Sequence, residues 1–447
     1  MKLLFVSLGC DKNLVDSEVM LGLLSEKGYE LTEDEMEADV IVINTCCFIH
    51  DAKEESIETI LEMSELKKTG KLKALVVAGC LSERYKEEFK KELTEVDSIL
   101  GTTSFDKIVE AVEQSLKGHS EEIFESIHYL PDTSKVERVV TTGHYMAYLK
   151  IAEGCNKRCT YCIIPSIRGN FRSVPMEQLI QEATNLAKKG IKELVLVAQE
   201  TTLYGKDIYG EKTLPKLLHE LGKIEGIEWI RLLYSYPEEI TDELIETMAN
   251  EPKVCHYIDM PIQHCEDRIL KRMGRRTNKE QLKEIVGKLR TAMPDISIRT
   301  TLITGFPGET EEDHENMLAF VDEMEFDRLG VFTYSKEEDT PAAKFEDQIE
   351  EDVKIRRREE LMELQQAVSY DKAQEMIGKQ VKVLIEGYLY DEDIYVGRTY
   401  KDAPKVDGCI FVKSEEEIIS GDFVEVMVTS ASEYDLIGEV IYRELTE

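Results

Sequence analysis

Short apolar runs alternate with amphipathic stretches along the first quarter of the chain. The runs KLLFVSL, ADVIVINT and KALVVAG predict buried strands, and helical patterns follow them at 13–27, 52–68 and 82–93. Such alternation is typical of parallel strands joined by helices. We therefore expect an N-terminal open parallel α/β sheet domain over residues 1–116, followed by a polar linker over residues 117–143.

A second series of strand and helix patterns begins at Tyr145. Six apolar runs predict strands, and helical patterns fill the gaps between them; the runs are YMAYLKIA, KELVLVAQ, EWIRLLYS, HYIDMPI, DISIRTTLI and RLGVFTYS. Six strand–helix repeats are too few for a closed eight-fold barrel. The pattern over residues 144–350 therefore predicts a partial (β/α)6 barrel.

The C-terminal part of the chain changes period. A single helical pattern covers residues 351–377, and Gly378 ends it. Beyond that glycine, apolar and polar residues alternate with a period of two, interrupted by the turn sequences DEDIYVG, APKVDG and ISGD. This pattern predicts a connecting helix followed by a small antiparallel β-barrel over residues 378–447.

Composition limits the classes of protein to which the chain can belong. It contains no run of about 18 apolar residues, so we expect no membrane-spanning helix, and the apolar run at residues 3–8 is shorter than the core of a signal peptide. Ten cysteines in 447 residues are too sparse for a secreted disulfide scaffold. We therefore expect a cytoplasmic protein with reduced thiols, in which clustered cysteines indicate a metal site.

Three cysteines lie within eight positions in the sequence GCNKRCTYCIIP, as Cys155, Cys159 and Cys162. They follow the predicted strand YLKIAEG, and the carboxyl ends of barrel strands carry the chemistry of such folds. Thiolates favour zinc or an iron–sulfur cluster. A structural zinc ion usually has four protein ligands, whereas three thiolates on a four-iron cluster leave one iron open to a reactant. A zinc site completed by Cys255 or Cys265 is the alternative.

Three further cysteines each follow a predicted parallel strand: Cys10 after LLFVSLG, Cys46 after DVIVINT and Cys80 after KALVVAG. The carboxyl ends of strands in an open α/β sheet share one edge, where ligands bind. We therefore expect these thiols to converge on a second metal centre. The alternative is three buried packing cysteines. Cys47 is adjacent to Cys46 and is expected to point elsewhere.

The stretches SLGCDKNLVDSE, INTCCFI, VAGCLSERY and EGCNKRCTYCIIPSIRG together resemble the methylthiotransferases of the radical S-adenosylmethionine superfamily. The resemblance covers nearly the whole chain. It implies an N-terminal methylthiotransferase domain, a radical S-adenosylmethionine partial barrel and a C-terminal barrel of the TRAM type. It also implies two 4Fe–4S clusters, one on each set of three cysteines, with S-adenosylmethionine on the open iron of the barrel cluster.

Within that family, the stretches IIPSIRG, AQETTLYG, IEWIRLLYSYP and RLGVFTYS resemble the branch that modifies an aspartate of small-subunit ribosomal protein S-twelve. Asp11 is a small departure, since a proline is frequent at that place. Charge supports this branch, because the chain has a net charge of −35 and residues 378–447 carry seven Lys and Arg against sixteen Asp and Glu. An acidic barrel suits a basic protein better than RNA; the alternative is that the acidic charge serves solubility alone.

The resemblance further implies that Cys155, Cys159 and Cys162 form the catalytic centre, where a 5′-deoxyadenosyl radical is generated. That radical would remove hydrogen from the unactivated β-carbon of the aspartate. The cluster of the N-terminal domain would hold the sulfur, and a second S-adenosylmethionine would supply the methyl group. The implied partners are an electron donor such as flavodoxin or ferredoxin and a sulfur donor.

Three more residues are predicted to bind the cofactor from their positions. Gln199 and Glu200 follow the second strand of the predicted barrel and are placed to bind the amino group of S-adenosylmethionine. Tyr161 precedes Cys162 and is placed to contact the adenine.

Two other functions remain open at this point. A tRNA adenosine methylthiotransferase would use the same clusters, but that branch typically has Gln-Met-Asn after its first cysteine, where this chain has Asp11, Lys12 and Asn13. A two-cluster iron–sulfur electron carrier with an RNA-binding barrel would not consume S-adenosylmethionine. It would also leave the open irons without a purpose.

Overall fold

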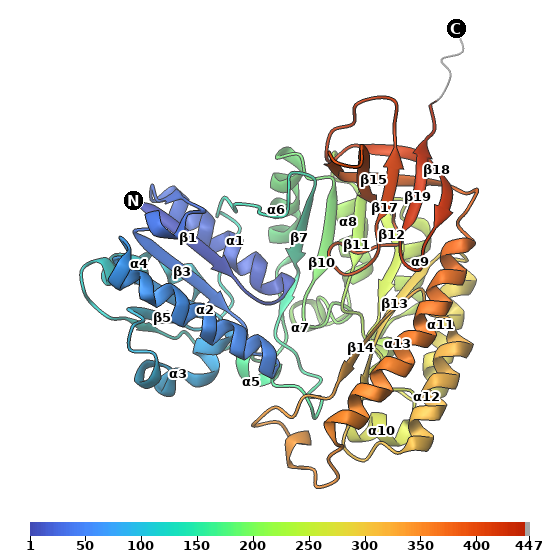
Figure 1. The fold of residues 1–447 in the computed structure, drawn as a ribbon, viewed down its shortest axis with the longest axis horizontal. Helices are drawn as coiled ribbons and strands as arrows, with labels where there is room; N and C mark the ends of the chain where they lie inside the picture. Colours follow the sequence, from blue (N-terminus) through green and yellow to red (C-terminus); the bar gives the residue numbers. More distant parts are fainter. Residues whose placement is uncertain (443–447) are drawn as a thin grey trace.

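The N-terminal unit is an open sheet of six parallel strands in the order β2-β1-β3-β4-β5-β6, which confirms the expected class. The computed structural model describes residues 1–442 (Figure 1). Every residue of β3 and β4 is buried, and this explains why their sequences are continuous apolar runs. The elements are β1 (Lys2–Ser7), α1 (Asp11–Glu26), β2 (Glu30–Leu31), β3 (Val40–Thr45), α2 (His50–Thr69), β4 (Ala74–Gly79), α3 (Cys80–Glu92), β5 (Ser98–Leu100), α4 (Ile108–Leu116) and β6 (Glu122–Ile123).

Helices cover both faces of this sheet, with α2 and α3 on one face and α1 and α4 on the other. The strand β6 comes from the segment 117–143, whose polar composition predicts only a linker, and it pairs with β5 at the sheet edge. Two residues are too few to give a periodic pattern, so the sequence contains no sign of this strand. The end of the same segment packs on α1, where the Val139 amide donates to the Glu18 carbonyl at 3.2 Å.

The central unit is a second sheet of six parallel strands in the order β14-β13-β12-β11-β10-β7, curved but not closed. The expected partial (β/α)6 barrel is confirmed. Its strands are β7 (Met146–Lys150), β10 (Glu193–Val197), β11 (Trp229–Leu232), β12 (Val254–Asp259), β13 (Ser297–Thr304) and β14 (Arg328–Thr333). Its main helices are α6 (Met176–Lys188), α8 (Leu214–Gly222), α9 (Asp242–Asn250), α11 (Lys279–Ala292) and α12 (Glu311–Met324). Shorter elements are β8 (Ala152–Glu153), α5 (Ile164–Arg168), β9 (Arg172–Ser173), α7 (Lys206–Tyr209) and α10 (Asp267–Arg272).

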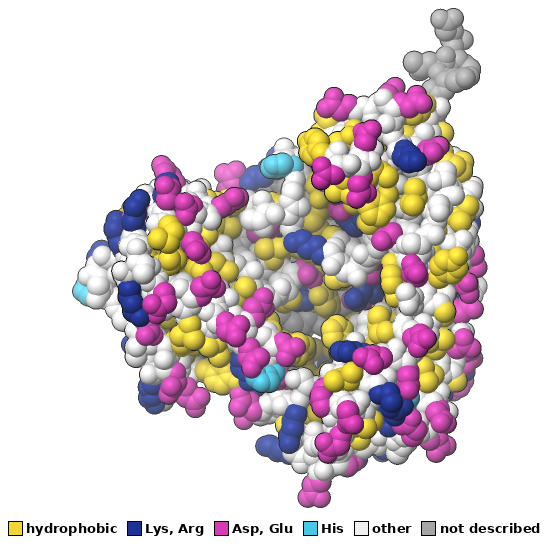
Figure 2. Space-filling view, in the orientation of Figure 1, with side chains coloured by type: hydrophobic (Ala, Val, Ile, Leu, Met, Phe, Trp, Pro, Cys, Tyr) yellow, Lys and Arg dark blue, Asp and Glu magenta, His cyan; other side chains and the backbone are white. Residues whose placement is uncertain are grey.

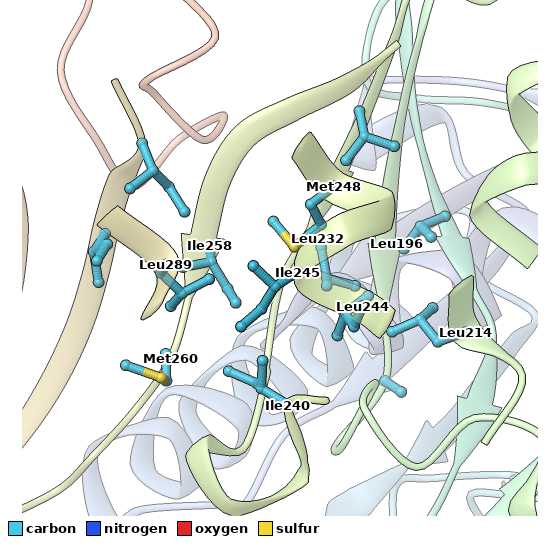
Figure 3. Packing of buried hydrophobic residues seen from close by; sticks show 14 of the residues in the cluster. Leu196, Leu214, Leu232, Ile240, Leu244, Ile245, Met248, Ile258, Met260 and Leu289 are labelled. Carbon is cyan, nitrogen blue, oxygen red and sulfur yellow. The ribbon is translucent and has the colours of Figure 1, made fainter. Parts of the chain in front are cut away.

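The outer face of the barrel sheet holds the largest hydrophobic core. Leu196, Leu232 and Ile258 project from adjacent strands toward apolar side chains of α9, among them Leu244 and Met248 (Figure 3). All five are nearly inaccessible to solvent. Burial of such side chains contributes about 1.5–3 kcal/mol each, so this layer fixes the positions at which the strands end and the site begins.

The amino ends of the barrel strands are closed by the C-terminal unit. Arg231 of β11 donates to the Tyr400 carbonyl at 2.5 Å, and Ser297 of β13 donates to the Lys401 carbonyl at 3.0 Å. Glu193 of β10 is fully buried and accepts from Arg231 at 2.8 Å and from Arg398 of the C-terminal unit at 2.6 Å. Because these charges are paired with one another, this end of the barrel is a structural seal, and reactants must enter at the carboxyl ends.

The C-terminal unit follows the long helix α13 (Glu351–Gln374) and is a closed five-stranded barrel in the order β15-β16-β17-β19-β18. Its strands are β15 (Gln380–Leu389), β16 (Ile394–Arg398), β17 (Ile410–Lys413), β18 (Phe423–Ala431) and β19 (Leu436–Val440). The sequence predicts an antiparallel barrel, but β17 and β19 pair in parallel. A closed ring with an odd number of strands cannot alternate direction at every step, so one parallel pair is unavoidable. No helix within residues 1–442 is long and apolar enough to cross a membrane.

Candidate functional site

Cys155, Cys159 and Cys162 lie on the loop between β8 and α5, at the carboxyl end of the first barrel strand. Backbone hydrogen bonds shape this loop: the Cys155 amide donates to the Gly169 carbonyl and the Cys162 amide to the Cys159 carbonyl, both at 3.1 Å. Cys155 and Cys159 are buried, and Cys162 is partly exposed. One loop therefore presents all three thiols at the barrel mouth.

Burial raises the pKa of Cys155 to about 11 and also raises that of Cys162, and the neighbouring thiols raise both further by charge repulsion. Without a cation these thiols are protonated at neutral pH, so a bound metal must displace their protons. In residues 1–442 no group of three or more Cys, His, Asp or Glu side chains is arranged to hold a single metal ion. A single tetrahedral zinc ion would draw its thiolates to within about 4 Å of one another, whereas a multi-iron cluster binds each thiolate to a different iron. Three thiolate donors on one loop fit three corners of such a cluster.

The alternative fourth zinc ligands lie elsewhere. Cys255 is buried on the inner face of the barrel, near Arg231 and the sealed amino end. Cys265 donates from its thiol to the Asn316 carbonyl at 3.7 Å. Cys409, in the C-terminal unit, contacts Asp435 at 3.5 Å. None of the three joins the barrel cysteines.

The predicted cofactor residues take different positions around this loop. Gln199 is occupied at both ends, since it accepts from the Gly154 amide and donates to Glu153, each at 2.8 Å. Glu200 is fully buried, and its Oε2 lies 3.3 Å from Lys157 Nζ but accepts no hydrogen bond among the described residues. Burial raises the pKa of Glu200 to about 7 despite the lysine. Oε2 is therefore a buried oxygen that is paired with Lys157 but accepts no hydrogen bond among the described residues, and this fits the ammonium group of a ligand.

Tyr161 is the third predicted cofactor residue. Its ring meets Phe306 edge-on, with ring centroids 6.4 Å apart. Phe306 belongs to the Gly-rich loop after β13, so the tyrosine joins the first and fifth strands of the barrel mouth. Burial raises the pKa of the Tyr161 phenol well above its usual value, and the nearby Cys159 raises it further.

The other three predicted cysteines converge at one edge of the N-terminal sheet. Cys46 follows β3 directly, Cys80 is the first residue of α3 after β4, and Cys10 caps the amino end of α1 after β1. These strands are adjacent in the sheet. Cys46 and Cys80 are buried and Cys10 is exposed. Burial raises the pKa of Cys80 to about 12; the nearby Arg168 lowers this pKa, and the neighbouring Cys46 and Cys10 raise it.

Two glycines lie at the strand ends from which these thiols project. Gly9 has φ +88°, and a Cβ on it would lie 2.9 Å from the Cys46 sulfur. Gly79 has φ +101°, and a Cβ there would lie 2.4 Å from Asn44 Oδ1. Both the backbone conformation and the space exclude a side chain. Gly9 therefore leaves space beside the Cys46 sulfur, and Gly79 allows the end of β4 to pack closely on the end of β3.

Asn13 and Arg168 contribute to this site and were not predicted from the sequence. The buried Asn13 donates through Nδ2 to the Leu8 carbonyl at 2.7 Å and to the Thr45 carbonyl at 3.1 Å. Arg168 on α5 reaches the Cys80 sulfur at 3.5 Å. The only sequence signals were their places inside the stretches CDKNLVDSE and IIPSIRG, because no periodicity distinguishes a buried polar side chain from an exposed one.

Cys47 lies in the same apolar cluster as Cys80, and the prediction that it takes no part in the site stays a prediction. Cys47 is fully buried in the core beneath α2 and α3, and its carbonyl accepts from Arg84 at 3.0 Å. The prediction rests on the alternation of a strand, in which neighbouring residues face opposite sides.

The two cysteine sets face one boundary between the N-terminal unit and the barrel. Figure 2 shows a hollow at this boundary with Lys and Arg side chains at its rim. Tyr234, at the end of β11, donates through its hydroxyl to Asp11 Oδ2 at 2.9 Å, and Lys12 Nζ lies 3.4 Å from the centre of its ring. The loop of Cys10 therefore contacts the barrel mouth directly.

Three family models match the chain: uncharacterized protein family UPF0004 at residues 2–101, the radical SAM superfamily at 149–321 and the TRAM domain at 377–441. The ribosomal protein uS12 methylthiotransferase RimO of Lachnoclostridium phytofermentans is 62% identical over 438 residues, covering 98% of this chain and 99% of the relative. Proteins of the same name from Thermoanaerobacter sp. and Clostridioides difficile are 51% and 49% identical, over 97% and 99% of this chain and 98% and 99% of their own.

Solved structures of similar fold share little sequence. The radical S-adenosylmethionine methyltransferase TsrM of Kitasatospora setae, with cobalamin and a 4Fe–4S cluster bound, gives a TM-score of 0.56 at 14% identity, covering 76% of each chain. The cobalamin-dependent radical enzyme OxsB gives 0.51 at 14% identity, covering 81% of this chain and 56% of the other. At this identity the likeness concerns the fold alone.

Proposed function

This chain belongs to the family of ribosomal protein uS12 methylthiotransferases, and we propose that it attaches a methylthio group to the β-carbon of an aspartate in uS12, the S-twelve protein. The observation that carries this proposal is 62% identity, over 98% of the chain, to a relative of that name. The match extends through all three units of the chain.

We assign the first 4Fe–4S cluster to Cys155, Cys159 and Cys162. When bound, this cluster supplies the electron that cleaves S-adenosylmethionine and so the radical that removes hydrogen from the substrate. The chain contributes the positions of the three thiols, which lie on one loop, with those of Cys155 and Cys159 buried. Glu200 is the acceptor for the cofactor's ammonium group and Tyr161 the contact for its adenine, while Gln199 orients the loop through the Gly154 amide.

We assign the second 4Fe–4S cluster to Cys10, Cys46 and Cys80, where it holds the sulfur that is transferred. Support comes from the convergence of three adjacent strand ends and from Gly9, which leaves space beside the Cys46 sulfur. Both sites face the same boundary, so a substrate side chain bound there can meet the radical and then the sulfur without leaving.

The substrate is a basic protein in this proposal, and the chain's net charge of −35 supports it. Acidic side chains are spread over the C-terminal barrel (Figure 2). Complementary potentials would speed the encounter and favour uS12 over RNA. We further propose an electron donor such as flavodoxin or ferredoxin, a separate sulfur donor, and a cytoplasmic reaction, since ribosomal proteins reside there.

Mass spectrometry of ribosomal proteins and tRNA from a strain lacking this chain tests the proposal. We expect uS12 to lose the mass of one methylthio group and to regain it when the wild-type gene is restored. Loss of a methylthio group from tRNA instead would support the tRNA methylthiotransferase. No change in either would leave the electron carrier as the better account.

A further inference from the structure

The guanidinium of Arg168 is fully buried between the two cysteine sets, and four groups surround it. Nη1 donates to Asp16 Oδ2 at 2.8 Å and to Glu153 Oε2 at 3.0 Å. Nη2 donates to Asn13 Oδ1 at 2.6 Å and to the Cys80 sulfur at 3.5 Å. Because both terminal nitrogens of the planar Arg168 guanidinium are hydrogen-bonded, the group has one orientation only. Its contact with the Cys80 sulfur is therefore a fixed feature of the fold.

On the N-terminal side, these contacts reach the loops of all three thiols. Arg168 touches Cys80 directly. Through Asn13 it supports the Leu8 carbonyl, two residues before Cys10, and the Thr45 carbonyl, one residue before Cys46. A shift of the guanidinium would therefore move each of the three sulfur atoms.

On the barrel side, the same guanidinium reaches the loop of the other cysteine set. Its partner Glu153 accepts from Gln199 at 2.8 Å and from the Gly154 amide at 3.1 Å, one residue before Cys155. Glu153 Oε2 also pairs with Lys150 Nζ at 2.9 Å. The charges around Arg168 balance: Arg168 and Lys150 face Asp16 and Glu153.

We propose that Arg168 is a positioning residue that holds the two cluster sites in register and, through its hydrogen bond to the Cys80 sulfur, raises the reduction potential of the N-terminal cluster. The inference rests on the proposed function, namely that Cys10, Cys46 and Cys80 hold a 4Fe–4S cluster. Hydrogen bonds and positive charge at a ligating sulfur stabilise the reduced, more negative cluster, and so make its potential less negative.

A redox titration of the N-terminal cluster tests this inference. The full chain carries Cys159→Ala, so that only the N-terminal cluster contributes a signal after anaerobic reconstitution, and Arg168→Gln or Arg168→Lys is added. We expect the midpoint potential, followed by electron paramagnetic resonance, to become more negative with Arg168→Gln. Arg168→Lys keeps the charge but not the fork, and we expect a smaller shift in the same direction.

Arg138 provides the matched control. It is buried and also links α1 to the barrel, through ion pairs with Glu18 at 3.1 Å and Glu182 at 2.5 Å and a hydrogen bond to the Tyr148 carbonyl at 2.7 Å. It contacts no cysteine. Arg138→Gln should lower the unfolding temperature of the iron-free protein about as much as Arg168→Gln does, but leave the midpoint potential unchanged.

The outcomes separate the possible failures. An unchanged potential in Arg168→Gln overturns the inference, and so does an equal shift in Arg138→Gln, which would trace the effect to general loosening of the boundary. If Arg168→Gln does not load iron, the midpoint potential of Arg168→Lys is the test. A potential more negative than that of the wild type supports the inference, and a wild-type potential overturns it. If the Cys159→Ala parent itself carries no cluster, the assignment of the second cluster fails instead.

Discussion

The chain builds its two sets of three cysteines in different ways. Cys155, Cys159 and Cys162 share one loop of eight residues, which closes with little loss of chain entropy. Cys10, Cys46 and Cys80 are 36 and 34 residues apart and meet only after three strands have paired. The local set depends on the conformation of one loop, whereas the distributed set depends on the whole N-terminal sheet.

This difference has consequences for metal binding. A site whose ligands converge only in the folded state gains its affinity together with the folding of its domain. Iron binding at the distributed set should therefore respond to changes in the N-terminal core, while iron binding at the local set should not. Variants that affect one set and spare the other test this separation.

The largest expected effect is that of Cys159→Ala in the local set. Formation of 5′-deoxyadenosine should fall to background and methylthiolation should stop, because the cluster that cleaves S-adenosylmethionine has lost a ligand. Iron should fall from about eight to about four atoms per chain. Anaerobic reconstitution followed by iron and sulfide analysis, with chromatography for 5′-deoxyadenosine, measures both. Retention of cleavage would contradict the assignment of the first cluster.

Cys46→Ala in the distributed set should give the complementary result. Iron should again fall to about four atoms per chain, but 5′-deoxyadenosine should still form, because the barrel loop is intact. The methylthiolated protein should not appear. The same two assays measure iron content and 5′-deoxyadenosine formation, and mass spectrometry of uS12 measures methylthiolation. A simultaneous loss of cleavage would show that the two sites do not bind iron independently.

Gly9→Ala tests whether the distributed set requires its backbone geometry. A Cβ on Gly9 would lie 2.7 Å from the Cys46 Cβ and 2.9 Å from its sulfur, in addition to the positive φ. We expect a loss of about 1–3 kcal/mol of unfolding free energy and a large loss of iron from the N-terminal cluster, measured by denaturant unfolding and iron analysis.

Gly28→Ala is the control for Gly9→Ala. Gly28 also has a positive φ, +85°, but no atom lies within 4 Å of the added Cβ. It should cost about 1 kcal/mol and leave iron unchanged. An equal loss of iron in both variants would mean that strain alone, and not the space between the thiols, governs the site.

The sequence predicted most of what periodicity and spacing can reveal. The six strands of the barrel and the cysteines that follow β1, β3 and β4 were predicted from apolar runs and from the shared edge of a parallel sheet. The parallel β17–β19 pair and the two-residue strand β6 were not predicted. The first depends on closure of the five-stranded barrel, and the second depends on pairing with a strand distant in the sequence. Asn13 and Arg168 were missed because their roles arise from burial and from partners in another unit.

The smallest expected effect, and the finest test of the comparison, is Cys47→Ala. Cys47 is adjacent to Cys46, and its side chain is buried in the apolar core that also contains Cys80. Removing a buried sulfur should cost about 1 kcal/mol of unfolding free energy through the cavity that remains, with iron content and methylthiolation at wild-type levels. Unfolding, iron analysis and mass spectrometry of uS12 measure the three quantities. Loss of iron in Cys47→Ala would show that the Cys47 thiol also takes part in binding the cluster.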